Sequence, residues 1–183
     1  VETLRVEGSD AAAVTVSASQ ITAAGTNVDG ANAGVTTVEV VGALSDYTIH
    51  SGIDRLVLDD TANSVRLSQA AQSVVGGSSG DTVGMIHNAT GRIDLGVGAD
   101  SLDVVVLADG VDISAATLVG VDELYVKDTG NVSVSVSAED LGNGAEPRRV
   151  RTEASASDVI LAVSVQGALS GYTIDSDIDV LRL

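Results

Sequence analysis

The sequence predicts an all-β chain wound into a parallel β-solenoid, in which short strands stack along one axis. Three observations support this prediction: apolar residues alternate with small polar ones, one long stretch occurs twice, and aromatic residues are almost absent. Tandem β-sandwich repeats are the alternative fold, because they also combine alternation with repetition. We expect residues 1–183 to form a single repeat segment of a longer protein.

The alternation is clearest in two stretches that predict strands. Residues 132–138 read VSVSVSA and residues 13–21 read AVTVSASQI. A period of two places every second side chain on the same face of an extended strand. Clusters of Gly, Asn, Asp and Ser separate such stretches and indicate turns between strands.

The repeat is the strongest pattern in the chain. Residues 42–58 read GALSDYTIHSGIDRLVL and residues 167–183 read GALSGYTIDSDIDVLRL, with identity at 12 of 17 positions. A looser form of its second half opens at Val1, Ile53, Val121 and Ile178. Internal repetition of this kind is typical of stacked supersecondary units.

The rarity of aromatic residues favours the solenoid over the sandwich. The chain has three Tyr and neither Phe nor Trp. A sandwich usually fills a gap of about 10 Å between its sheets with some aromatic side chains, whereas a narrow solenoid stacks aliphatic ones. At about 20 residues per coil, the chain would form about nine coils. We expect loops at residues 23–37 and 142–158.

The net charge of −17 limits the partners of the chain. It arises from 26 acidic and nine basic residues, and it disfavours binding to nucleic acid or to anionic membranes. No uninterrupted apolar stretch is long enough for membrane insertion. The absence of cysteine excludes thiolate metal sites and disulfides. Divalent cations are natural partners for such a chain, although acidity is also typical of proteins from salty habitats.

Arg148, Arg149 and Arg151 form the one basic patch in this acidic sequence. They lie in the predicted loop 142–158, which also holds the only proline. The patch is either a solvated loop or a contact with an acidic neighbouring subunit or an anionic polysaccharide.

Two turn sequences suggest calcium binding. Residues 76–84 read GGSSGDTVG and residues 95–103 read LGVGADSLD. Both keep parts of the nonapeptide G-G-x-G-x-D-x-U-x, in which glycines shape a turn and carbonyl and carboxylate oxygens bind Ca2+. The spacing of Asp81 and Asp100 is close to two nonapeptide lengths, as expected for turns stacked on one edge. The candidate metal ligands are Gly77, Asp81, Gly96, Gly98, Asp100 and Asp103; a plain Gly/Asp turn is the alternative.

These degenerate nonapeptides resemble those of RTX (repeats-in-toxin) proteins. The small-residue strands and the opening VETLRV also resemble the repetitive regions of RTX-type bacterial S-layer proteins and large secreted adhesins. The resemblance is one of composition over most of the chain and of motif only at residues 76–103. It implies secretion to the bacterial cell surface and a calcium-dependent lattice or adhesive stalk. Its partners would be neighbouring copies or segments of the same surface protein.

We expect a non-catalytic structural role. Asp175 occupies the repeat position of His50, which disfavours a Ser-His-Asp site, and Lys127 lies in a polar turn rather than in a recognisable catalytic cluster. Two alternatives remain open. One is an adhesin module that binds cell-surface polysaccharide through the repeat tyrosines, Tyr47 and Tyr172. The other is a fragment of a β-helix polysaccharide lyase.

Overall fold

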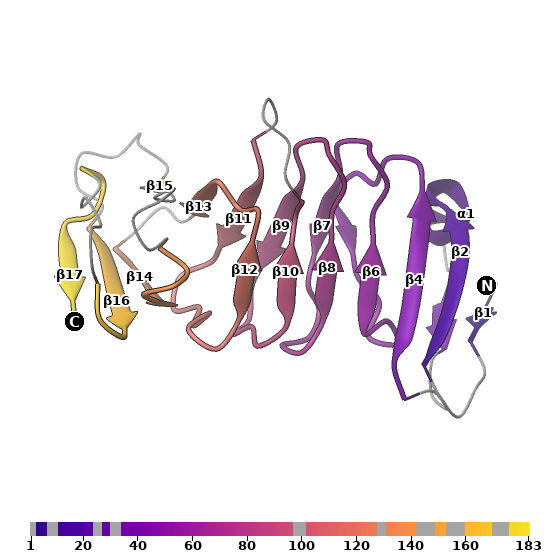
Figure 1. Ribbon diagram of the computed structural model, residues 1–183, viewed down its shortest axis with the longest axis horizontal. Helices are drawn as coiled ribbons and strands as arrows, with labels where there is room; N and C mark the ends of the chain where they lie inside the picture. Colours follow the sequence, from indigo (N-terminus) through magenta and orange to yellow (C-terminus); the bar gives the residue numbers. More distant parts are fainter. Residues whose placement is uncertain are drawn as a thin grey trace.

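The computed structural model describes residues 3–6, 11–23, 27–29, 34–96, 102–127, 131–141, 149–152, 160–169 and 176–183. This part of the chain is a parallel β-solenoid with one short helix, so the predicted fold class is confirmed. The strands stack along one axis and the two termini lie at opposite ends of the stack (Figure 1).

Two parallel sheets of six strands form the walls of the solenoid. Sheet I contains β2 (Ala12–Ser17), β4 (Thr36–Val41), β6 (Arg55–Val57), β8 (Ser73–Val75), β10 (Arg92–Asp94) and β12 (Thr117–Val119). Sheet II contains β5 (Tyr47–Thr48), β7 (Ser64–Arg66), β9 (Thr82–Met85), β11 (Val104–Leu107), β13 (Glu123–Val126) and β15 (Arg149–Thr152). The chain alternates between the two sheets, so neighbours within a sheet come from successive coils.

Two smaller parallel sheets lie outside these walls. One pairs β1 (Thr3–Arg5) with β3 (Asn27–Asp29), and the other contains β14 (Val132–Ser137), β16 (Leu161–Gln166) and β17 (Val180–Arg182). The helix α1 (Ala18–Thr22) follows β2 directly.

The coils follow a regular period in the first half of the stack. Thr37 pairs with Arg55 and Arg55 pairs with Ser73, so successive steps along sheet I advance the sequence by the same amount. Longer connections interrupt this period, as in the pairing of Arg92 with Thr117. Because such connections use residues without adding strands, the main sheets have six strands each in the described part of the chain, fewer than the nine coils expected.

Stacked rows of aliphatic side chains fill the space between the two sheets. The inner row of each sheet is buried from the second strand of that sheet onward, whereas Val14 of β2 and Tyr47 of β5 are partly buried. Full burial of one such side chain stabilises the fold by about 1.5–3 kcal/mol. The rows are Val38, Leu56, Val74, Ile93 and Leu118 from sheet I, and Val65, Val83, Val105, Leu124 and Val150 from sheet II.

The sequence repeat corresponds to a structural repeat at the two ends of the stack. Strands β2, β4 and β6 pair side by side near the N-terminus, and β14, β16 and β17 pair in the same way near the C-terminus. Gly42 and Gly167 both have positive φ, 97° and 104°. Asp54 accepts a hydrogen bond from the N–H of Thr36 at 2.7 Å, and Asp179 accepts one from the N–H of Leu161 at 2.8 Å.

The looser form of the repeat is not a structural unit. Its copies at Ile53 and Ile178 contain the equivalent strands β6 and β17, but its copy at Val121 contains β13, which belongs to sheet II. A buried-strand pattern of apolar residues fits either wall of the solenoid. Its presence alone therefore does not fix the place of a strand in the coil.

Three local predictions need correction. The strand predicted over residues 13–21 ends at Ser17, whose hydroxyl accepts a hydrogen bond from the N–H of Gln20 and begins α1. The loop predicted at residues 23–37 contains β3 and the start of β4. The loop predicted at residues 142–158 contains β15, so Arg149 and Arg151 belong to sheet II, whereas Arg148 lies outside the described residues.

Candidate functional site

The two predicted calcium turns occupy the same edge of the solenoid. Residues 76–81 connect β8 to β9, and residues 95–103 connect β10 to β11, so both turns carry the chain from sheet I to sheet II. Gly77, Asp81, Gly96 and Asp103 are described, whereas Gly98 and Asp100 lie outside the described residues.

The strand register brings Asp81 next to Asp103. Thr82 pairs with Val104, and the residues immediately before them are Asp81 and Asp103. The turn 95–103 is longer than the turn 76–81, and this extra length moves the aligned aspartate from position 100 to position 103. The pairing of Asp81 with Asp100 that their spacing predicts stays a prediction, because Asp100 lies outside the described residues.

Asp81 and Asp103 belong to a column of side chains that we call the corner ladder: Asn63, Asp81, Asp103 and Asp122. Each side chain accepts a hydrogen bond from the backbone N–H at the equivalent position of the preceding coil. The N–H of Asn63 donates to Asp81 at 2.9 Å, that of Asp81 to Asp103 at 2.7 Å, and that of Asp103 to Asp122 at 2.8 Å. At the first rung, the N–H of Leu44 donates to Asn63 at 2.9 Å.

The two central carboxylates of the ladder are buried. Asp81 is 0% exposed and Asp103 is 2% exposed. Asp81 also accepts hydrogen bonds from the Asn63 side-chain amide at 3.1 Å and from the N–H of Gly77 at 3.2 Å. Burial raises the pKa of Asp81, and burial together with the nearby charges of Asp81 and Asp122 raises the pKa of Asp103 to about 6.

The described residues alone do not complete a calcium site, and the candidate ligands Gly98 and Asp100 lie outside them. Calcium prefers six to eight oxygen ligands, yet the Asp81 carboxylate is surrounded by N–H donors and Asp103 binds the N–H of Asp81. No group of three acidic, histidine or cysteine side chains in the described part of the chain could hold a metal ion. The arrangement fixes the start of strands β7, β9, β11 and β13 in sheet II.

The glycines of the two motifs have a packing role. A Cβ atom at Gly77 would overlap the carbonyl of Asp59, and one at Gly96 would overlap the carbonyl of Gly77. At Gly120, one coil further on, it would overlap the carbonyl of Gly96. We call Gly77, Gly96 and Gly120 the glycine column. Successive coils approach so closely there that only glycine fits.

A calcium titration tests the metal prediction. Because the Asp81 and Asp103 carboxylates are occupied by backbone donors, we expect the same thermal unfolding midpoint in millimolar calcium as in excess chelator. A ligand that binds only the folded state would raise that midpoint in proportion to the logarithm of its concentration. A rise of several degrees that grows with the logarithm of the calcium concentration would instead support a calcium site that includes Asp100.

A second candidate site lies on the outer face of sheet II. It is a cavity of about 600 Å³ above strands β5, β7, β9, β11 and β13. Its lining includes Asp46, Arg66, His87, Tyr125 and Lys127. The sequence alone does not predict this site, because its lining residues come from several coils and only the strand register shows which of them align.

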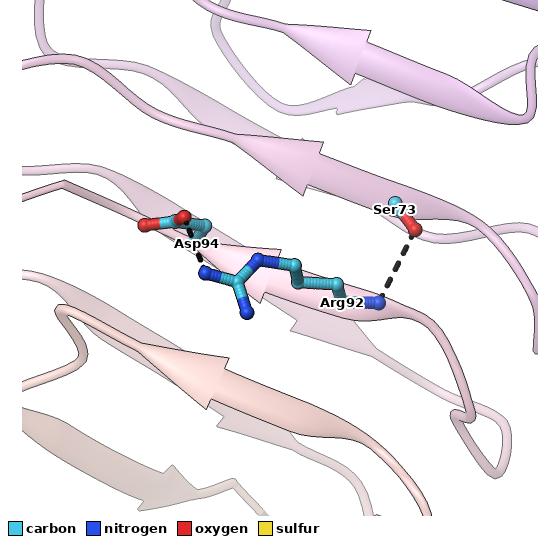
Figure 2. Close-up of polar contacts among 3 residues, drawn as sticks. All are labelled: Ser73, Arg92 and Asp94. Carbon is cyan, nitrogen blue, oxygen red and sulfur yellow. Dashed lines mark hydrogen bonds and ion pairs between the residues drawn. The ribbon is translucent and has the colours of Figure 1, made fainter.

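The outer face of sheet I carries an ion pair but is not part of this cavity. The Arg92 guanidinium lies 2.9 Å from the Asp94 carboxylate on β10, and the Arg92 N–H donates to the Ser73 hydroxyl on β8 at 3.2 Å (Figure 2). Two outward residues of one strand therefore pair with each other.

The residues considered for other functions have structural contacts. The N–H of Gly52 donates to Nδ1 of His50 at 3.2 Å, within a turn. Tyr47 is half-buried against the core, and burial raises its pKa. Tyr172 and Asp175 lie outside the described residues.

Comparison with known proteins does not assign the chain to a family. No protein-family model, no curated protein and no solved structure matches it. The resemblance to RTX-type surface proteins therefore stays a prediction. Among the described residues, no helix has the length and apolar character needed to cross a bilayer.

Proposed function

We propose that the chain is a non-catalytic structural segment of a secreted bacterial surface protein, in which it acts as a rigid spacer or lattice element. The observation that supports this role best is the structural repeat. The unit β2–β4–β6 at one end of the stack recurs as β14–β16–β17 at the other, with equivalent Asp54 and Asp179 caps. Such repetition is typical of solenoids, whose coils contact mainly their neighbours.

The chain's own contacts supply rigidity along the axis. Backbone hydrogen bonds link each coil to the next and hold strands about 4.8 Å apart. The corner ladder adds a side-chain bond at each of several coil junctions, and the aliphatic rows exclude water between the sheets. The length of such a rod follows from its number of coils.

Insertion of one coil tests the spacer role. Residues 55–72 form one complete coil, because Arg55 pairs with Ser73. A second copy of these residues, placed between Gln72 and Ser73, should lengthen the rod by one strand spacing, about 4.8 Å. Distances between labels on globular domains fused to both ends would measure this, by pulsed dipolar spectroscopy.

Matched controls complete that experiment. A Gly/Ser insertion of equal length at the same place should broaden the distance distribution without a defined increment. A broad distribution for the original chain would contradict the spacer role. Antibody labelling of intact cells of the source organism tests the surface location, which would be contradicted if labelling required lysis.

A further inference from the structure

We propose that the outer face of sheet II binds an acidic oligosaccharide, whose chain runs along the solenoid axis. This inference goes beyond the spacer role and does not depend on it. We call the site the sheet II groove and define it by Thr48, Arg66, Gly84, Val106, Tyr125 and Lys127.

The strand register aligns the floor of the groove. Thr48 pairs with Arg66, Arg66 with Gly84, Gly84 with Val106, and Val106 with Tyr125. These outward positions therefore form one row perpendicular to the strands. Since Gly84 has no side chain, the row is hollow between Arg66 and Val106. From β7 to β13 it crosses three strand spacings, about 14 Å, which suits a linear ligand rather than a compact one.

Cationic side chains gather at this face although the chain as a whole is strongly acidic. The cationic side chains are Arg66 and Lys127, whereas Asp46 is the one carboxylate among the described lining residues. The Arg66–Asp46 pair is exposed, with side-chain exposures of 48% and 62%. Exposed pairs contribute little stability, so Arg66 is able to exchange Asp46 for a ligand carboxylate.

The groove also contains aromatic and hydroxyl groups suited to sugars. Tyr125 packs against Arg151 of β15, whose guanidinium lies 5.6 Å from the centre of the Tyr125 ring and forms an ion pair with the buried Glu123 at 2.7 Å. The hydroxyls of Ser64 and Thr82 also line the cavity. Apolar and aromatic surface with a few placed polar groups is the usual composition of a small-molecule site. Guanidinium groups favour planar carboxylates because they form paired hydrogen bonds with them.

The geometry disfavours a peptide as the occupant. Strands β7, β9, β11 and β13 each pair on both sides, so their backbone N–H and C=O groups are already used. A peptide that adds a strand to a sheet needs a free edge. The remaining recognition is through side chains on a sheet face, which suits a ligand rich in hydroxyl and carboxylate groups.

Calorimetric titration of the whole chain with defined oligomers tests the proposal. The probes are hexamers of mannuronate and of galacturonate, neutral maltohexaose, and a hexaglutamate peptide. We expect at least one uronate hexamer to bind about tenfold more tightly than maltohexaose, because an ion-assisted hydrogen bond contributes about that factor. Arg66→Ala and Lys127→Ala should each weaken uronate binding about tenfold.

Two variants separate loss of binding from loss of folding. Gly84→Val fills the hollow, and the nearest atom to the added Cβ is the flexible Arg66 Cγ at 3.1 Å. Since valine favours strands, this variant should keep or raise the melting temperature while it abolishes uronate binding. Arg92→Ala removes a cation of the same type, also paired with an aspartate, from sheet I, and should leave binding unchanged.

Several outcomes would overturn the proposal. These are no binding of either uronate hexamer, equal binding of maltohexaose, or equal weakening by Arg92→Ala, which would indicate a general charge effect. Binding of hexaglutamate alone would show that the groove takes an acidic peptide. None of these results alters the rod length measured after coil insertion, so the two proposals fail separately.

Discussion

Gly120→Ala should lower the free energy of unfolding by about 2–5 kcal/mol. Gly120 has φ +63°, and an added Cβ would overlap the backbone carbonyl of Gly96 in the preceding coil. A backbone carbonyl cannot rotate away as a side chain can. Relief of the overlap therefore requires the two coils to move apart. Denaturant unfolding of the whole chain, followed by circular dichroism, measures the change.

Gly110→Ala is the matched control for this prediction. Gly110 also has positive φ, +73°, but an added Cβ would have no neighbour within 4 Å. Gly110→Ala should therefore lower the free energy of unfolding only by the cost of placing alanine at positive φ, about 1–2 kcal/mol. Equal destabilisation by the two variants would show that the glycine column does not limit the approach of the coils.

The sequence was sufficient to predict the wall of the solenoid. Strict alternation in VSVSVS of β14 places Val132, Val134 and Val136 on the core side, where all three are buried. The duplicated stretch likewise predicted stacked repeat units, and its two copies contain the equivalent strands β6 and β17. These features are local, since a period of two and a direct repeat need no knowledge of neighbouring coils.

The candidate sites depended on information that the sequence does not carry locally. Asp81 stacks on Asp103 because the second turn is longer than the first, and turn length is fixed only once both flanking strands are assigned. The sequence shows the glycine and aspartate residues of the motifs but not their roles. Close coil packing and strand capping require the same residue types as a calcium turn does. The sheet II groove needed the register of five strands.

Asp103 should make the chain less stable as the pH rises from about 4 to about 7. Its pKa in the folded chain is about 6, above the ordinary value of 3.8. Between these values the folded state binds more protons than the unfolded state, so the free energy of unfolding falls with increasing pH. The contribution is fully present below pH 3.8 and is lost above pH 6. We expect the free energy of unfolding to fall by about 1–2 kcal/mol over this range. This is less than the full pKa shift implies, because water reaches the exposed Asp122 at the next rung.

Asp103→Asn and Asp103→Ala together test this origin. Asparagine keeps an oxygen for the N–H of Asp81, and Asn63 already fills the equivalent place in another coil. Asp103→Asn should therefore raise stability at pH 7 by about 1–2 kcal/mol and flatten its pH dependence. Asp103→Ala should lower stability at low pH by about 1–3 kcal/mol, because the N–H of Asp81 loses its acceptor. Asp54→Asn, at an exposed cap of the same kind, controls for the change in net charge. An unchanged pH slope in Asp103→Asn would mean that another group causes it.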